Sequence, residues 1–252
     1  MLNIVLPMAG RGSRFADAGY DLPKPLIPVL GVPMIELVIA NLTPRRPHRF
    51  HFLARREHVE GFGLAEKLQA WAPGSTLTLV EEVTEGAACT VLLAREAIDG
   101  ADPLMIANCD QYVDADIDAY LGAMGPADGL IMTMWADDPK WSFVRRDAGG
   151  RVVEVVEKVV VSNEATVGVY NFARGADFVR AAEAMIAGDR RVNGEFYVAP
   201  AYDELIAEGA EIRCHDIGAG MHGIGTPADL DAFLATETAR RAVARMAARA
   251  IS

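Results

Sequence analysis

The sequence predicts an α/β protein with a mostly parallel, twisted sheet of Rossmann-like type and a β-rich extension. In the first half, short apolar strand candidates alternate with helical patterns, which is typical of a parallel sheet covered by helices on both faces. The strand candidates are residues 3–6, 50–53, 77–80 and 104–106, and the helical patterns are residues 34–42, 57–71 and 87–98. Because ligands of such sheets bind beyond the carboxyl ends of the strands, a site is expected in the segments that follow them.

After about residue 129 the pattern becomes β-rich, and no linker, repeat or low-complexity tract separates the two halves. The second half is therefore expected to extend the same sheet. Strands are expected at 130–135, 143–146, 152–157 and 166–172, and helices at 177–186 and 198–207. A last helix is predicted to begin after the N-cap residue Thr226, with Pro227 at its first position, and to continue as a solvated Ala/Arg-rich helix beyond Thr238.

Composition excludes several classes of protein. The 252 residues carry 24 Lys+Arg against 35 Asp+Glu, a net charge of −11, which argues against nucleic-acid binding because phosphate backbones require a basic face. No apolar stretch approaches the ~20 residues of a membrane span, and the N-terminus lacks the features of a signal peptide. The three widely spaced cysteines favour a reducing compartment, so we expect a cytoplasmic protein without nucleic-acid or membrane partners.

The segment LPMAGRGSRF, directly after the first strand candidate, has the features of an anion-binding loop. Gly10 and Gly12 allow the backbone to approach a phosphate chain closely, and Arg11 and Arg14 can bind phosphate oxygens. The loop matches neither the Walker A pattern nor GxGxxG, because Phe15 stands at the place of the third glycine. The pattern therefore predicts phosphate binding without a dinucleotide fingerprint.

Lys24 follows within LPKPLIP, where prolines on both sides restrict the backbone. Together, LPMAGRGSRF and LPKPLIPVLGVPMIE closely resemble the opening of the nucleotidyltransferases that activate sugar 1-phosphates and similar compounds, the pyrophosphorylase family. The resemblance implies a nucleotide-diphospho-sugar transferase (GT-A-like) fold. It also implies Mg²⁺-dependent transfer of a nucleoside monophosphate from a nucleoside triphosphate to a phosphorylated small molecule, with release of pyrophosphate. Catalytic roles fall on Arg14 and Lys24, and nucleotide binding in the loop falls on Pro7, Ala9, Gly10, Arg11, Gly12 and Ser13.

The segment EEVTEGAA, at a strand end and a helix start, is similar to the segment with which the family reads the base. The resemblance assigns nucleotide binding to Glu81, Gly86 and Ala87. Many sugar-activating members carry Gln where this chain has Glu81. Because a carboxylate only accepts hydrogen bonds, it favours a base edge with an amino group, so CTP is slightly favoured. The alternative is a solvated acidic loop before a helix.

Asp110 follows the strand candidate 104–106, at the point where the family binds its metal. A carboxylate at the carboxyl end of a central strand suits Mg²⁺, a cation that prefers oxygen ligands. The resemblance therefore implies that Asp110 is a metal ligand. The alternative is an Asp that caps a helix or a turn, a role for which Asp114 and Asp116 are better suited.

The chain departs from the family at a second metal position. Many members carry W-x-D-[VI]-G-T, whereas this chain reads MHGIGT, so that Gly223 replaces the Asp. Either Asp110, phosphates and water hold the metal, or His222 or Asp216 substitutes. The ending MHGIGTP, together with the earlier stretch NCDQYV, is similar to a branch associated with bacterial capsule and surface-polysaccharide genes, in which cytidylyl transfer occurs.

A second group of residues is implied to bind the acceptor. Lys158 is expected to contact its phosphate and to act in catalysis, and Glu157 to contact its polar groups, with Gly168 and Glu195 adding contacts. Without the other motifs, Glu157 and Lys158 would be an ordinary surface pair. The resemblance implies one domain over residues 1–252, with a nucleotide-binding half (1–128), an acceptor-binding part (129–226) and a C-terminal helix (227–252).

Two other functions stay open. A GT-A-type glycosyltransferase usually holds its metal by a D-x-D pair, but here Asp110 is followed by Gln111 and Tyr112. A catalytically impaired, nucleotide-binding regulatory subunit would explain Gly223. No spacing of Ser, Cys or His residues predicts a nucleophilic triad. The identity of the acceptor and an oligomeric state are left open by the sequence.

Overall fold

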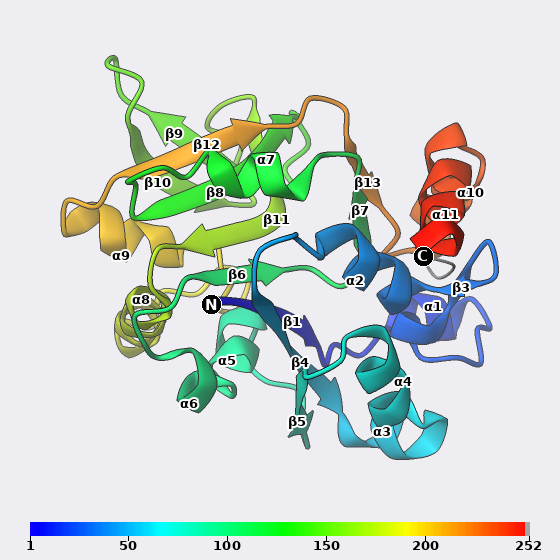
Figure 1. Cartoon of the computed structure of the whole chain (residues 1–252). Coiled ribbons are helices and arrows are strands. Elements are labelled where there is room, and N and C mark those ends of the chain that lie inside the picture. Colours follow the sequence, from blue (N-terminus) through cyan, green and yellow to red (C-terminus); the bar gives the residue numbers. More distant parts are fainter. Residues whose placement is uncertain (250–252) are drawn as a thin grey trace.

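Nine strands form one twisted sheet in the computed structural model, which describes residues 1–249, and side chains as far as residue 247. The first-half strands are β1 (Leu2–Met8), β4 (His48–Arg55), β5 (Thr76–Val80) and β6 (Leu104–Ala107). They run parallel in the order β6-β1-β4-β5, as predicted from the alternation of strands and helices. Their carboxyl ends therefore meet at one edge of the sheet (Figure 1).

The second half adds strands to the same sheet. They are β8 (Gly129–Trp135), β9 (Ser142–Arg146), β10 (Val152–Glu157), β11 (Glu164–Phe172) and β12 (Ile212–Asp216), of which β12 was not predicted. β11 lies antiparallel between β6 and β8 and also pairs with β9, while β12 runs parallel to β8. The predicted fold class, a parallel Rossmann-like sheet with a β-rich extension, is confirmed.

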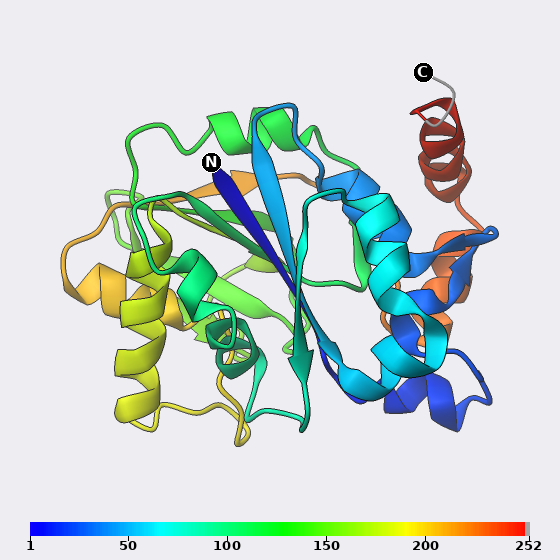
Figure 2. The same cartoon turned by 60° about the horizontal axis from the view of Figure 1, so that its bottom comes forward.

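Helices cover both faces of the sheet (Figure 2). One face carries α2 (Met34–Leu42), α3 (Arg56–Phe62) and α4 (Leu64–Trp71), and the other carries α5 (Ala87–Leu92), α6 (Arg95–Ile98), α8 (Gly175–Ala187) and α9 (Ala201–Ala207). The alternation along β1 explains this arrangement. Ile4 packs in the same core cluster as Met34 of α2, whereas Val5 packs with Val91 of α5 and Phe178 of α8. Both faces of β1 are thus buried.

Two predicted helices are interrupted. The pattern at 57–71 is divided into α3 and α4 at Gly63, which adopts the left-handed φ of 58°. The pattern at 87–98 is divided into α5 and α6 at residues 93–94. The prediction of single helices was wrong because hydrophobic periodicity continues across a one- or two-residue break. Gly63 was the available signal, since glycine favours left-handed helix ends.

The C-terminal part, expected as one helix over 227–252, contains two: α10 (Pro227–Leu234) and α11 (Glu237–Arg249). Residues 250–252 of that prediction lie outside the described residues. The predicted cap is present, because the Thr226 hydroxyl accepts a hydrogen bond from the Asp229 amide at 3.1 Å. α11 is not fully solvated: Ala239 and Ala242 are buried, and the helix packs against α2.

Several short elements were not predicted. They are α1 (Ser13–Asp17), the 3-10 turn η1 (Lys24–Leu26), the hairpin of β2 (Pro28–Val29) and β3 (Val32–Pro33), the pair of β7 (Gln111–Val113) and β13 (Met221–Gly223), and α7 (Ile117–Gly122). Elements of two to six residues are too short to show a hydrophobic period. Several of them carry or adjoin predicted site residues.

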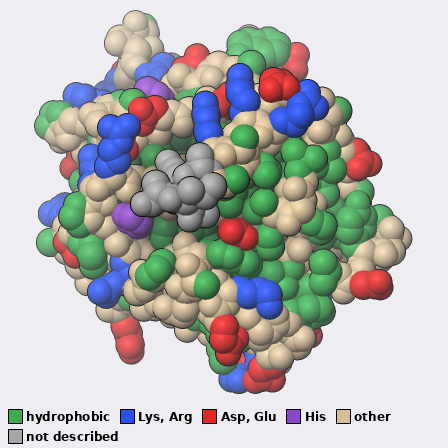
Figure 3. All heavy atoms as spheres, turned by 45° about the vertical axis from the view of Figure 1, so that its right-hand side comes forward, with side chains coloured by type: hydrophobic (Ala, Val, Ile, Leu, Met, Phe, Trp, Pro, Cys, Tyr) green, Lys and Arg blue, Asp and Glu red, His purple; other side chains and the backbone are tan. Residues whose placement is uncertain are grey.

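Within residues 1–249, no helix is both long and apolar enough to cross a bilayer. Figure 3 shows the side of the molecule that carries α10 and α11. Lys and Arg side chains are interspersed there with Asp and Glu side chains. This face therefore offers no continuous basic field of the kind that binds nucleic acid.

The buried His51 makes stability depend on pH. It lies in β4, with Nε2 3.0 Å from Asn3 Oδ1 and Nδ1 2.7 Å from Thr76 Oγ1. Burial, assisted by the charge of Arg49, lowers the pKa of His51 to about 4. The unfolded chain, with a His pKa of about 6.5, therefore binds the proton first as pH falls, so stability is lost below about pH 6.5.

We expect the unfolding free energy of the wild-type protein to fall by about 1 kcal/mol between pH 7.5 and pH 5.5 because of His51. Urea unfolding at both pH values measures this loss. A His51→Asn variant should show a smaller loss than wild type, whereas His48→Gln, at the start of the same strand, should keep the wild-type dependence. Equal losses in wild type and His51→Asn would contradict the assignment.

Candidate active site

The glycine-rich loop connects β1 to α1 at the carboxyl edge of the sheet. Gly12 has a φ of 63° and forms the N-terminal boundary of α1, a backbone conformation that favours glycine. Phe15, fully buried, anchors the loop to the core, while Gly10, Arg11, Ser13 and Arg14 remain exposed. The loop therefore presents backbone N–H groups and two arginines to solvent, as anion binding requires.

Lys24 and Asp110 meet between the ends of β1 and β6. Lys24 Nζ lies 2.6 Å from Asp110 Oδ2, and both side chains are partly buried. Burial alone would lower the pKa of Lys24, but the Asp110 carboxylate outweighs it and the pKa is raised, while the charge of Arg14 acts in the opposite direction. A cationic Lys24 is therefore paired with Asp110, and Arg14 lies near enough for its charge to act on Lys24, so the structure brings three predicted residues into one region. We call them the phosphate cluster.

Asp110 is the carboxylate that could hold Mg²⁺. Within residues 1–247, no three His, Cys, Asp or Glu side chains are grouped so as to hold a metal ion. Gly225 leaves the space beside Asp110 open, because a Cβ there would lie 2.3 Å from Asp110 Oδ2. Mg²⁺ commonly uses one or two carboxylates and completes its shell with substrate phosphates and water. Asp110 thus fits a metal that is held largely by a nucleotide.

Gly223 stands where many family members have a metal-binding Asp, and neither His222 nor Asp216 replaces that carboxylate in the structure. His222 packs its ring 5.2 Å from that of Phe233, and burial lowers the pKa of His222. Asp216 accepts a backbone N–H at 2.8 Å within its own turn. The carboxylate nearest to Gly223 belongs to Asp229, whose Cγ lies 3.8 Å from the position of a Cβ on Gly223. Asp229 lies in the first turn of α10 and was not considered from the sequence as a substitute for the missing Asp.

The predicted acceptor residues form a second cluster. Lys158 donates a hydrogen bond to Tyr197 Oη, and its ammonium lies 4.2 Å from the centroid of that ring. Glu157 is only 7% exposed and accepts a hydrogen bond from Ser142. Burial raises the pKa of Glu157, while Ser142 and Lys158 oppose the shift. Burial and the neighbouring Glu195 raise the pKa of Tyr197, so Glu195 belongs to this acceptor cluster too.

Tyr197 was missed by the sequence analysis, although it lies two residues after Glu195. Lys158 itself has a φ of 58°, which is unusual for a residue with a side chain. Its backbone N–H donates to Trp141 C=O at 3.0 Å, which fixes this conformation. Lys158 is thus positioned from both its backbone and its ammonium.

Gly168, the remaining predicted acceptor residue, joins β11 to the segment before Asp110. It has a φ of 79°, and a Cβ there would lie 2.1 Å from Asn108 Nδ2. Gly168 C=O also accepts a hydrogen bond from the Asn108 amide at 3.0 Å. A side chain at this position would separate β11 from the segment that carries Asp110. The absence of a side chain at Gly168 therefore allows β11 to pack closely against the segment before Asp110, independently of any contact with an acceptor.

Gly86 links the base-reading segment to the acceptor cluster. With a φ of 138°, it lies so close to Phe196 that a Cβ would be 2.4 Å from Phe196 O. The Ala88 amide donates to Phe196 O at 3.0 Å, and the Phe196 amide donates to Glu85 O at 2.8 Å. Ala87 begins α5 beside this contact. The two segments are therefore joined by main-chain hydrogen bonds.

Glu81 is engaged by an arginine that the sequence analysis missed. Arg56 donates to both Glu81 oxygens, with Nε at 3.0 and 2.9 Å and Nη2 at 2.6 Å from Oε1. These hydrogen bonds lower the pKa of Glu81. Both residues follow parallel strands, β4 and β5, and are exposed at the carboxyl edge. The segment thus presents a carboxylate and a guanidinium side by side.

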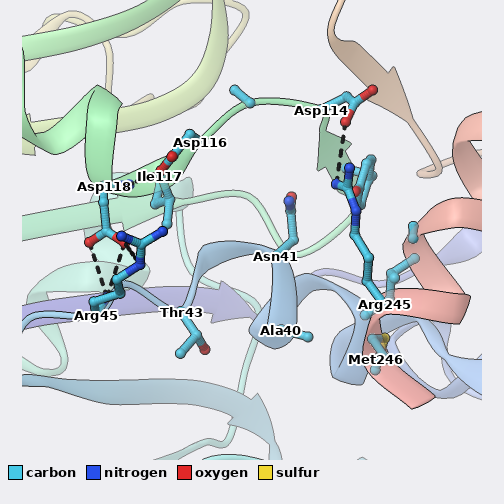
Figure 4. A pocket seen from close by; sticks show the side chains of 14 residues that line it. Ala40, Asn41, Thr43, Arg45, Asp114, Asp116, Ile117, Asp118, Arg245 and Met246 are labelled. Atoms are coloured by element: carbon cyan, nitrogen blue, oxygen red, sulfur yellow. Dashed lines mark hydrogen bonds and ion pairs between the residues drawn. The ribbon is translucent and has the colours of Figure 1, made fainter. Parts of the chain in front are cut away.

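Two cavities differ in their relation to the predicted site residues. The larger, about 460 Å³, lies between α2, the segment after β7 and α11 (Figure 4). Two of its acidic groups are paired with arginines: Asp118 lies 3.5 Å from Arg45, and Asp114 lies 3.7 Å from Arg245. The third, Asp116, accepts backbone N–H groups at the start of α7. No predicted site residue lines it. A smaller cavity of about 280 Å³ is lined by Arg11, Gly12 and Lys24, so this one belongs to the candidate site.

The parallel sheet, the glycine loop after β1 and the adjoining phosphate cluster define the class of α/β proteins that bind phosphorylated ligands at the strand ends. The family model described as "Nucleotidyl transferase" matches residues 3–197. The chain therefore belongs to the nucleotidyl transferase family.

Individual relatives agree with this assignment. The chain is 29% identical over 222 residues to the bifunctional protein GlmU of Azotobacter vinelandii, which covers 84% of this chain and 46% of that protein. It is also 29% identical over 227 residues to GlmU of Burkholderia multivorans, with the same coverage. The chain thus spans about half the length of the curated relatives it matches.

Solved structures show the same fold. A nucleoside-diphosphate-sugar pyrophosphorylase from Vibrio cholerae RC9 aligns with a TM-score of 0.80 at 27% identity, over 92% of this chain and 100% of that one. A UDP-glucose pyrophosphorylase complexed with UDP-glucose aligns with a TM-score of 0.74 at 15% identity, over 91% and 96%. The second likeness concerns the fold alone.

Proposed function

We propose that this chain transfers a nucleoside monophosphate from a nucleoside triphosphate to a sugar 1-phosphate or a similar phosphorylated small molecule, and releases pyrophosphate. A phosphate oxygen of the acceptor attacks the α-phosphorus, and the bond from that phosphorus to the bridging oxygen of the β-phosphate breaks. The second pKa of a phosphomonoester is near ~6, so the acceptor is already mostly dianionic at neutral pH and needs no general base. The main barrier is repulsion between two anions.

The observation that carries the proposal is the phosphate cluster beside the glycine loop. Lys24 and Arg14 would bind the triphosphate with the loop N–H groups and offset the negative charge that develops on the leaving pyrophosphate. Asp110 holds Lys24 in place at 2.6 Å. Mg²⁺, held by Asp110 and the nucleotide, would add Lewis-acid stabilisation of the phosphoryl oxygens. EDTA is accordingly expected to abolish turnover.

The acceptor cluster supports a phosphorylated acceptor with polar groups. Lys158 offers a cation for its phosphate, and the buried Glu157 and exposed Glu195 offer acceptors for hydroxyl groups. Because Gly86 attaches this cluster to the nucleotide side, and Gly168 packs β11 against the segment before Asp110, we propose one domain over residues 1–252. Its nucleotide-binding half is 1–128, its acceptor-binding part is 129–226, and its C-terminal part is 227–252.

We further propose a place in the synthesis of surface-polysaccharide precursors in the cytoplasm. Two segments, NCDQYV and MHGIGTP, carry the similarity to capsule-associated members. These segments form the β7–β13 pair, in which the Ile224 amide donates to Asp110 C=O at 2.9 Å. The features that distinguish this branch thus surround the proposed metal ligand.

CTP is the proposed nucleotide. Glu81 can accept from the cytosine amino group, while Arg56 beside it can donate to the ring nitrogen or carbonyl. We expect Glu81→Gln to shift the ratio of kcat/KM for CTP over UTP by roughly tenfold toward UTP, because an amide can also donate. Glu82→Gln, at the adjacent exposed residue, is the matched control and should leave the ratio unchanged. An unchanged ratio in Glu81→Gln would contradict this base-reading role.

The test of the function is a screen for Mg²⁺-dependent pyrophosphate release with four nucleoside triphosphates against a panel of sugar 1-phosphates and phosphorylated alcohols. A nucleotide-linked product is expected with at least one pair. Nucleotide binding without turnover across the panel would instead favour a regulatory subunit. Sugar transfer from a nucleotide sugar would favour a glycosyltransferase.

A further inference from the structure

The strand that follows Asp110 is short and lies outside the main sheet. β7 has three residues, and among the described residues it pairs with β13 alone. Asp110 C=O accepts a hydrogen bond from the Ile224 amide at 2.9 Å. The Asp114 amide donates to Gly220 C=O at 2.7 Å, so both groups face β13. Because the bonding direction alternates along a strand, the N–H and C=O of Val113 face the opposite edge. A two-stranded ribbon is only marginally stable by itself, so the position of β7 depends on what holds that edge.

Asn41, near the end of α2, occupies this edge of β7. Its Nδ2 donates to Val113 C=O at 2.8 Å, and its Oδ1 accepts from the Val113 N–H at 2.9 Å. Figure 4 shows the side chain of Asn41 projecting from α2. One side-chain amide thus takes the place of a neighbouring strand, which requires a donor and an acceptor in the same group. Asn41 therefore attaches β7, and with it the adjoining Asp110, to α2.

The other end of α2 is attached to the segment that carries Lys24. The amide of Met34, the first residue of α2, donates to Ile27 C=O at 2.9 Å. The Ile27 amide in turn donates to Lys24 C=O at 3.2 Å. Since Lys24 Nζ lies 2.6 Å from Asp110 Oδ2, these contacts form a closed series from Lys24 through η1, α2 and β7 back to Asp110. The two ends of α2 therefore determine how Lys24 and Asp110 meet.

We infer that Asn41 is a positioning residue for nucleotide transfer: it holds β7 on α2, and so holds the Asp110 carboxylate where it meets Lys24. The inference rests on the proposed function, because that function places Mg²⁺ and the triphosphate beside Asp110. Gly223, on the neighbouring strand β13, supplies no second carboxylate, so the placement of the metal depends more strongly on Asp110. Asn41 bonds to the main chain of Val113 and therefore acts through β7.

Calorimetric titration of the full chain with the Mg²⁺ complexes of ATP, CTP, GTP and UTP tests the inference, with the nucleotide that wild type binds most tightly carried through. We expect Asn41→Leu, similar in size but without a donor or an acceptor, to weaken the Kd about tenfold. The groups that support a metal ligand are typically worth about 10–100-fold in affinity or activity. Asn41→Ala should have the same effect, since it also loses both bonds, cannot overpack and favours the helix.

Thr43→Val is the matched control. Thr43 lies at the same end of α2, and its hydroxyl donates to Ile39 C=O at 2.7 Å within that helical turn. Its loss removes a hydrogen bond of similar length without removing the attachment of β7. Thr43→Val should therefore bind the Mg²⁺–nucleotide complex as wild type does. Thermal unfolding verifies that each variant is folded.

A double-mutant cycle separates positioning from a general effect on the structure. Asp110→Asn is expected to weaken binding of the Mg²⁺ complex by itself, while the glycine loop still binds the triphosphate. If Asn41 acts through Asp110, adding Asn41→Leu to Asp110→Asn should change the Kd less than about twofold. In turnover assays, Asn41→Leu should lower kcat about tenfold and leave the KM for the acceptor unchanged, because Lys158 and Tyr197 lie in other segments.

An unchanged Kd in both Asn41→Leu and Asn41→Ala would overturn the inference. Equal effects of Asn41→Leu with and without Asp110→Asn would overturn it as well, as would the absence of nucleotide binding by wild type. Wild-type turnover and binding in the two Asn41 variants would reject the role of Asn41 and leave the proposed function intact. A lack of turnover across the acceptor panel, with Asn41-dependent binding of the Mg²⁺–nucleotide complex, would reject the proposed function alone.

Discussion

Lys24→Ala is expected to lower kcat for pyrophosphate release by about 10²–10³-fold, because one preorganised donor aimed at developing charge is typically worth about 3–4 kcal/mol. Lys24 Nζ is the group that Asp110 holds at 2.6 Å beside the glycine loop. Its loss leaves no ammonium at the point where the triphosphate is proposed to lie. A coupled assay of pyrophosphate release measures the effect.

The fold should survive this substitution. The Asp110 carboxylate that loses its partner keeps 29% of its side chain exposed, so water can solvate it. The thermal unfolding midpoint is therefore expected to change little. Lys67→Ala, an exposed lysine on α4, is the matched control and should retain full turnover. Turnover of Lys24→Ala at the wild-type rate would remove Lys24 from the mechanism.

Gly86→Ala is expected to lower the unfolding free energy by about 3 kcal/mol or more. An added Cβ would lie 2.4 Å from Phe196 O, and the φ of 138° is strained for any residue with a side chain. Backbone strain and overpacking each cost about 1–3 kcal/mol. For a chain of this size the melting midpoint should fall by roughly 6–12 °C, which differential scanning calorimetry measures.

The same substitution should weaken nucleotide and acceptor binding together. Main-chain hydrogen bonds join Phe196, which adjoins the acceptor cluster, to Glu85 and Ala88 on either side of Gly86. Gly122→Ala, at the end of α7, is the matched control: a Cβ there meets nothing within 4 Å. Its stability and its affinity for both substrates should equal those of wild type. Unchanged stability of the Gly86→Ala protein would contradict the prediction, because it would show that the main chain at Phe196 can shift at little cost in free energy.

The phosphate cluster could be predicted from sequence because the fold class places strand ends at one edge and the resemblance to the family gives Lys24 and Asp110 their roles. The glycine loop and Asp110 each follow a buried parallel strand, and neighbouring strands β1 and β6 end at the same edge. Lys24 lies in a proline-restricted segment a few residues further on. Its pairing with Asp110 over 86 residues of separation needs only that shared edge. The loop, Lys24 and Asp110 therefore did not depend on details of side-chain packing.

The partners of the other candidates could not be predicted, because they depend on how separate segments pack. Arg56 reaches Glu81 from the next strand's carboxyl end, and Tyr197 reaches Lys158 from a loop beyond α8. Neither Arg56 nor Tyr197 lies in a sequence motif that would have indicated its role. Asp229 lies in the first turn of α10, where it accepts a hydrogen bond from Thr226, and no sequence motif places it beside Gly223.

The place of β11 between β6 and β8 has a consequence for any attempt to divide the molecule. A fragment that ends near residue 128 would lack the strand that covers the outer side of β6. Its unpaired amides and carbonyls would then be open to pairing with another copy of the fragment. Truncated expression of the first half should accordingly yield aggregates, and only a fragment that extends beyond residue 172 would keep β6 paired with β11.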